Sequence, residues 1–177
     1  MTLPKITLAE LQQKIKGIYF PESVYIVGIR GYYLDSMGKK GENDRGIYDD
    51  AIILVSPNVY ETYNGNTDPS KYIKGIATLI PGLHYYKKGK HKISSPKGYP
   101  AFRPASVDES LLVTRDGKEG VSKGIAINIH KGSYNSTSSE GCQTIHPDQW
   151  NSFITKAYKA MDKEGQKIIP YILIENK

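Results

Sequence analysis

The chain has 177 residues, which is the size of one ordinary domain and is long enough to bury a hydrophobic core. Hydrophobic residues at 38% and charged residues at 24% are typical of a folded protein and exclude a disordered chain, and no apolar run approaches the ~20 residues of a membrane-spanning helix. A net charge of +6 indicates an anionic partner without identifying it, and the single cysteine excludes an internal disulfide and a metal site built on paired cysteines.

The amino-terminal segment 1–20 carries charged and glutamine residues where a secretory signal needs an unbroken apolar stretch of roughly 7–15 residues. We therefore expect no export by that route and synthesis in the cytoplasm. Thr7 and Glu10 form the pattern of a capping box, and apolar residues follow at helical spacing. The segment 7–19 is predicted to hold a short amphipathic helix.

The middle of the chain consists of short runs rich in β-branched and aromatic residues, each ended by Gly, Pro, Asn or Asp. These runs are 24–34, 49–64, 75–86, 109–117 and 124–132. They predict a mainly β domain. The segments 63–72 and 88–106 are predicted to be the longest loops, where substrate contacts tend to lie.

The carboxyl-terminal part changes from strand to helix periodicity. Apolar residues in 148–165 share one helical face before Gly165, and they are Trp150, Phe153, Ile154, Ala157 and Met161. A final strand is predicted over 168–175. Because no repeat or linker interrupts the chain, we predict a single domain over residues 1–177.

The most informative segment joins His130 to Cys142. A predicted strand ends near His130, and a loop of small polar residues leads to Cys142. A histidine within hydrogen-bonding reach activates a cysteine nucleophile, and amides around Gly141 and Cys142 could face a developing oxyanion. The same segment is equally typical of a Ser- and Gly-rich hairpin loop that ends at a buried, inert cysteine. The residues alone leave both interpretations open.

This segment also resembles a known catalytic signature: His-x-Gly, a polar loop, Ser-x-Gly-Cys, then Pro-x-x-x-x-x-Phe. The matching positions are His130, Gly132, Ser139, Gly141, Cys142, Pro147 and Phe153. Over residues 125–154 the chain resembles the L,D-transpeptidases. The resemblance implies a β-sandwich-like catalytic fold with an amino-terminal helix and one helix after the cysteine. It also implies that Cys142 is the nucleophile, that His130 is the base, and that backbone amides at Gly141 and Cys142 hold the oxyanion.

The activity implied by the resemblance is formation of a cysteine acyl-enzyme at the L-to-D peptide bond after diaminopimelate in a peptidoglycan stem. Where the family usually has a second histidine this chain has Glu140, and Thr144 replaces an arginine or asparagine. The number of residues between His130 and the cysteine is also smaller than is usual in that family. Ser139 is added to the catalytic set, and Glu140, Arg115 and Tyr134 are candidate substrate contacts.

We therefore expect a peptidoglycan hydrolase of the endolysin or toxin type, an L,D-carboxypeptidase or endopeptidase. It would act in the periplasm or cell wall after delivery by a holin, a phage or a secretion apparatus, and its positive charge would favour an anionic envelope. One alternative is transfer, which makes 3-3 cross-links or exchanges D-amino acids. Another is a non-catalytic wall-binding or virion structural module. No cofactor, metal or nucleic-acid partner is expected.

Other polar residues have less specific signals. His146 is an alternative base, but it precedes Pro147 at an expected helix start, where a capping role is more usual. His84 and His91 lack neighbours at zinc-ligand spacing. The acidic residues Asp44, Asp49 and Asp50 would serve a muramidase only in a desolvated cleft, and loop carboxylates are usually solvated or capping.

Overall fold

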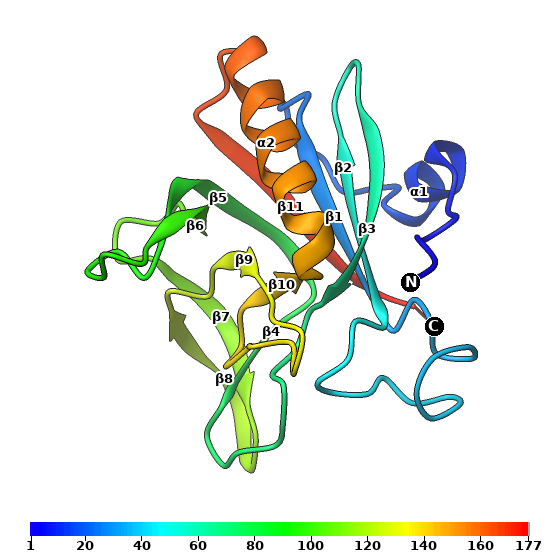
Figure 1. Cartoon of the computed structure of the whole chain (residues 1–177), viewed down its shortest axis with the longest axis vertical. Helices are drawn as coiled ribbons and strands as arrows, with labels where there is room; N and C mark the ends of the chain where they lie inside the picture. Colours follow the sequence, from blue (N-terminus) through cyan, green and yellow to red (C-terminus); the bar gives the residue numbers. More distant parts are fainter. Residues whose placement is uncertain (177) are drawn as a thin grey trace.

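A computed structural model describes residues 1–176 (Figure 1). The protein is mainly β with two helices, α1 (Leu8–Lys14) and α2 (Pro147–Lys163). The predicted fold class is confirmed at this level, since one helix opens the chain and the other follows the cysteine. In Figure 1, α1 lies at the right of the molecule and α2 runs diagonally across the strands.

Eight strands close into a barrel in the order β1-β11-β5-β6-β9-β10-β3-β2. They are β1 (Tyr25–Arg30), β2 (Asp50–Val55), β3 (Tyr60–Asn66), β5 (Gly82–His91), β6 (Tyr99–Pro104), β9 (Ile129–Lys131), β10 (Gln143–Ile145) and β11 (Ile168–Glu175). The pairs β1/β11 and β9/β10 are parallel and the other pairs are antiparallel. Closure removes the free sheet edges that would otherwise favour aggregation.

A second sheet of three strands lies beside the barrel. It is formed by β4 (Ala77–Leu79), β7 (Ser110–Arg115) and β8 (Lys118–Ile125) in the order β4-β7-β8. The chain passes from β8 through a short junction into β9 of the barrel. This junction brings the second sheet close to the segment that carries His130.

Strand β2 is a nearly continuous apolar run in the sequence because both of its faces are buried. Its side chains alternate between two hydrophobic clusters, as strand geometry requires. Ile52 and Leu54 belong to the cluster that includes the buried face of α2, whereas Ile53 and Val55 belong to a second cluster with Leu11 of α1. Because both faces of β2 are covered, its one polar residue is Asp50 at the start of the strand, which is buried and accepts from the Gly31 and Thr67 backbone N–H groups.

The two helices follow their predicted patterns with one difference in length. Thr7 caps α1, and its hydroxyl and the Glu10 carboxylate form the reciprocal bonds of a capping box. The helix ends at Lys14, so the prediction that it reached residue 19 was too long. Gly17 has φ 91°, a conformation in which a helix does not continue. In α2 all five predicted core residues are buried, and Gly165 follows the helix with φ 63°.

The loop predictions were only partly right. The segment 88–106 was predicted to be a loop, but it contains the end of β5 and all of β6, which pair from Tyr86↔Pro104 to His91↔Tyr99. Lysine, glycine and proline in these strands hid the alternation. Strand β10 also lies outside every predicted strand, since three residues are too few to show a period. The predicted loop 63–72 begins later, because β3 continues to Asn66.

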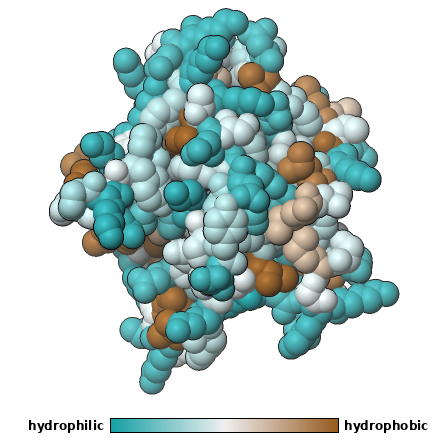
Figure 2. Space-filling view, in the orientation of Figure 1, coloured by the Kyte–Doolittle hydropathy of each residue, from teal (hydrophilic) through white to brown (hydrophobic). Residues whose placement is uncertain are grey.

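The surface is mixed in polarity. On the face shown in Figure 2, apolar residues form small separate groups among hydrophilic ones. Among residues 1–176, neither helix has the length and apolar character needed to cross a bilayer.

Tyr171 of β11 offers a test of the barrel interior. It is fully buried, and its hydroxyl donates at 2.7 Å to Oε1 of Gln143 on β10, which lies on the opposite side of the barrel. Replacement by Phe leaves that oxygen without a donor, so Tyr171→Phe should lower the free energy of unfolding by about 1–3 kcal/mol in urea denaturation. Tyr19→Phe, at a side chain that is 87% exposed, is the control and should change little. Equal stability of both variants would contradict the cross-barrel role.

Candidate active site

His130 lies on β9 with only 3% of its surface exposed. Its Nδ1 is 2.8 Å from the backbone oxygen of Lys131. Because a carbonyl oxygen only accepts, Nδ1 carries the proton and Nε2 keeps the free lone pair. Burial, and then the neighbouring His91, lower the pKa of His130 to about 3. The imidazole is therefore neutral at physiological pH and can accept a proton at Nε2.

His91 is a site residue that the sequence analysis missed. It ends β5, and its ring stacks on that of His130 with centroids 3.8 Å apart and planes within 14°. Its Nδ1 lies 3.4 Å from Nδ2 of Asn128. Burial lowers the pKa of His91 as well, with smaller effects of Lys92 and Arg103. Only the pairing of β5 with β6 and of β6 with β9 brings the two histidines together. No local motif carries that information.

Cys142 immediately precedes β10 and is partly exposed. Its Sγ donates to the backbone oxygen of Ala126 at 3.6 Å. Ala126 has φ 55°, an uncommon conformation for a residue with a Cβ. The pKa of Cys142 is raised to about 11, mainly by burial; the Asn128 backbone N–H lowers it and the charge of Glu140 raises it. The resting sulfur is therefore a neutral thiol.

Two cavities share Cys142, His91 and Glu140 in their walls. The first has a volume of about 340 Å³ and also contains His130. The second has a volume of about 610 Å³ and extends along the 92–95 segment toward Asn128. Nucleophile and base candidates therefore open onto one cavity, and the thiol is also reached from the other.

Ser139 holds the turn that leads to Cys142. Its hydroxyl donates to the Cys142 backbone oxygen at 2.7 Å and accepts from the Gly141 N–H at 3.1 Å. The Gly141 amide is therefore not free to face an oxyanion in this conformation, unlike the expectation from the sequence. The Cys142 N–H makes no hydrogen bond within the described residues 1–176.

Close packing against β4 explains why residue 141 is a glycine. Its φ is 126°, and a Cβ there would lie 2.6 Å from the Ala77 backbone oxygen of β4. Only glycine therefore lets the loop before Cys142 approach the second sheet this closely.

Of the remaining candidates from the sequence, Glu140 lies beside Cys142 in the cavity walls, whereas Arg115 and Tyr134 do not. Exposed Glu140 lies in the walls of both cavities. Arg115 lies on β7, where its guanidinium bonds the backbone oxygens of Gly75 and Lys123, and it shares a different hollow with Glu140. Tyr134 is 74% exposed and bonds Asp148. The structure therefore brings Cys142, His130, Ser139 and Glu140 together and leaves Arg115 and Tyr134 outside this group.

The other titratable residues have structural roles. His146 is the N-cap of α2 and accepts from the Asp148 N–H, so the capping interpretation is confirmed. His84 is buried and bonds the Ile80 backbone oxygen at 2.8 Å. Asp49 and Asp50 are buried, so they are not solvated, but each accepts a backbone N–H as a capping carboxylate does.

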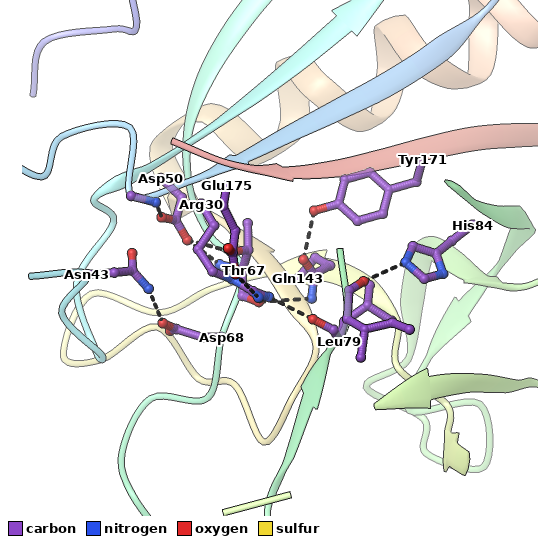
Figure 3. A network of polar contacts seen from close by, with 12 residues as sticks. Arg30, Asn43, Asp50, Thr67, Asp68, Leu79, His84, Gln143, Tyr171 and Glu175 are labelled. Carbon is purple, nitrogen blue, oxygen red and sulfur yellow. Dashed lines mark hydrogen bonds and ion pairs between the residues drawn. The ribbon is translucent and has the colours of Figure 1, made fainter. Parts of the chain in front are cut away.

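A buried polar network supports the site from within (Figure 3). Gln143, next to Cys142, accepts from Tyr171 and donates to the backbone oxygens of Gly141 and Thr67. Arg30 of β1 binds Thr67 through its Nε and one terminal nitrogen. The backbone beside the thiol is therefore tied to strands on the far side of the barrel.

No protein-family model matches the sequence, and no curated protein or solved structure is significantly similar to it.

The state of the thiol can be tested with iodoacetamide, which reacts with thiolate. With a pKa of about 11, Cys142 should be alkylated at pH 8 roughly 100-fold more slowly than free cysteine, and its rate should rise about tenfold per pH unit up to pH 9.5. Intact mass measures the rate, and the urea-unfolded chain, which should react like free cysteine, is the control. Fast alkylation that does not vary between pH 6 and 8 would instead indicate a thiolate–imidazolium pair.

Proposed function

We propose that this protein is a cysteine-nucleophile enzyme that acts on peptidoglycan stem peptides, most simply as a hydrolase of the L,D bond after diaminopimelate. The observation that carries the proposal is that Cys142, immediately before β10, and neutral His130, on the neighbouring strand β9, line one cavity. The strand, polar loop and cysteine follow the order of the L,D-transpeptidase signature. A distant relation to that fold is part of the proposal, and the mainly β architecture supports it.

The neutral state of both groups favours general-base catalysis over a preformed ion pair. As the sulfur of Cys142 attacks the scissile carbonyl carbon, its proton passes to Nε2 of His130. The tetrahedral intermediate then collapses, and the leaving amine takes that proton as the C–N bond breaks. The product is a thioester on Cys142. Water, deprotonated by His130, attacks it, releases the peptide carboxylate and restores the thiol.

The developing oxyanion needs a donor, and the Cys142 N–H fits this role better than Gly141, whose amide is bound to Ser139. Ser139 is then a positioning residue that fixes the turn. Glu140, on the wall of both cavities, is placed to receive the cationic amine of a diaminopimelate side chain. The charge of +6 favours an anionic envelope as the place of action.

Transfer differs from hydrolysis only in the second half-reaction, where an amine replaces water. A non-catalytic wall-binding module is the candidate of another class. It is favoured by one observation, the raised pKa of a thiol that is hydrogen-bonded to Ala126.

The decisive measurement is product analysis by mass after incubation with diaminopimelate-type tetrapeptides and cross-linked muropeptides. Wild type should remove a terminal D-residue or separate dimers. Cys142→Ala should abolish the products, and His130→Ala should reduce the rate by about 10²- to 10⁴-fold. His146→Asn keeps a good N-cap residue at α2 and should remain active. New dimers or D-amino-acid exchange would indicate a transferase. If wild type binds sacculi but changes no muropeptide, the wall-binding module replaces the enzyme.

His91 provides a separate test of the imidazole pair. Protonated His91 opposes protonation of His130, so His91→Phe, which keeps a stacked ring without the charge, should raise the pKa of His130. The acid limb of kcat/KM, below which His130 is protonated, should move to higher pH by on the order of one unit. Histidine NMR titration checks the same shift without turnover. An unchanged limb and an unchanged titration would contradict coupling between the rings.

A further inference from the structure

Four residues outside the cysteine site share an unusual property. Asn43, Asp49, Asn66 and Asp68 each have a side-chain Oδ1 that is buried and has no hydrogen-bond partner, and they account for four of the nine such atoms in the described chain. Asp49, Asn66 and Asp68 are each at most 4% exposed. An unpaired buried oxygen costs about 1–3 kcal/mol, so four in one region indicate a missing partner.

Hydrogen bonds join these residues into one group. Nδ2 of Asn43 donates to Asp68 Oδ2 at 2.7 Å, and Nδ2 of Asn66 donates to the Asp68 backbone oxygen. The next residue, Asp44, donates its N–H to Asp49 Oδ2 at 2.9 Å. Adjacent residues 43 and 44 therefore bridge Asp68 to Asp49. Each side chain uses one atom to hold a neighbour and leaves Oδ1 unused; Figure 3 shows Asn43 directed at Asp68.

Ionisation of the two carboxyl groups is disfavoured in this buried region. Burial, and then the charge of Asp50, raise the pKa of Asp68 to about 8, and burial followed by Asp50 raises that of Asp49 to about 7. Arg30 and Arg45 lower the pKa of Asp68 only partly. Their donors bind elsewhere, those of Arg30 to Thr67 and Leu79 and those of Arg45 to Asp116 and Lys71.

We propose that Asn43, Asp49, Asn66 and Asp68 bind a calcium ion through their Oδ1 atoms. Calcium takes six to eight oxygen ligands, and carboxylate and amide oxygens are its usual side-chain ligands. The proposed side-chain ligands are two carboxylates and two amides, and water or backbone oxygens would complete the shell. No group of three His, Cys, Asp or Glu side chains among residues 1–176 could hold a metal ion by itself. The proposal differs from the expectation based on the sequence, which was that no metal is bound.

The ion would join the segment before β2 to the end of β3. Beyond Asp68 the chain reaches Ser70, which bonds Thr137 and Ser139 of the loop before Cys142. Calcium would therefore stabilise the segment around Ser70, which holds the loop before Cys142. The site itself does not depend on the proposed enzymatic function.

The experiment compares thermal unfolding of chelator-treated protein with and without 5 mM CaCl₂. This concentration is several-fold or more above the dissociation constants of even the weaker calcium-binding modules. Calcium should raise Tm of wild type by several degrees, and more at pH 8.5 than at pH 6.0, because protons compete for Asp49 and Asp68. Asp68→Asn and Asp49→Asn should abolish the rise. Asp35→Asn, an exposed carboxylate of the same connection, is the matched control and should keep it.

The sign of the pH effect is fixed without calcium. The pKa values of Asp49 and Asp68 are raised in the folded state, so the stability they contribute is full below about pH 4 and is lost as pH rises through about 7–8. Calcium should offset that loss. No calcium-dependent rise in wild type, an equal rise in Asp68→Asn, or an equal rise with NaCl at matched ionic strength would each overturn the site. Isothermal titration of wild type with CaCl₂ gives the same decision if a variant fails to fold.

Discussion

The parallel pairing of β9 with β10 is the constraint on which the cysteine site depends. It aligns Thr144 with His130. Cys142 therefore lies just before β10, the strand that pairs with the one carrying His130. Parallel neighbours need a crossover of about a dozen residues, and segment 132–142 is close to that minimum. The short spacing between His130 and Cys142 is thus what this crossover allows.

So short a crossover has to be held in place by other elements. The Tyr48 hydroxyl donates to the backbone oxygens of Ser133 and Ser136, and a Cβ at Gly132 would lie 2.0 Å from that hydroxyl. The need for glycine at position 132 is therefore explained by Tyr48, without any contact with a substrate. At the other end, Ser139 bonds both Ser70 and Cys142. The loop is anchored to the segments after β1 and β3 before it reaches the thiol.

How much the sequence could predict follows from the range of the signals. The capping box at Thr7 and the apolar face of α2 are local patterns, and both were predicted correctly. Closure of the barrel, the short strand β10 and the stacking of His91 on His130 depend on pairing between distant segments, which one sequence does not show. The sequence pattern therefore identified Cys142 and His130 as candidates, whereas His91 became apparent only from the pairing of β5, β6 and β9.

The same interior explains why the thiol and the imidazole are both neutral at rest. Burial disfavours a thiolate and an imidazolium equally, and separating charge there would need compensation of several kcal/mol per ion. The sulfur donates to the Ala126 carbonyl, which would repel a thiolate, and the Asn128 backbone N–H and the charge of Arg103 favour the thiolate too little to offset burial. A substrate carbonyl beside Cys142 changes this balance, because the negative charge can move onto its oxygen and toward the Cys142 N–H. Under the proposed function, the nucleophile would form only when an acyl group is bound, and the single cysteine would be protected from oxidation and alkylation between turnovers.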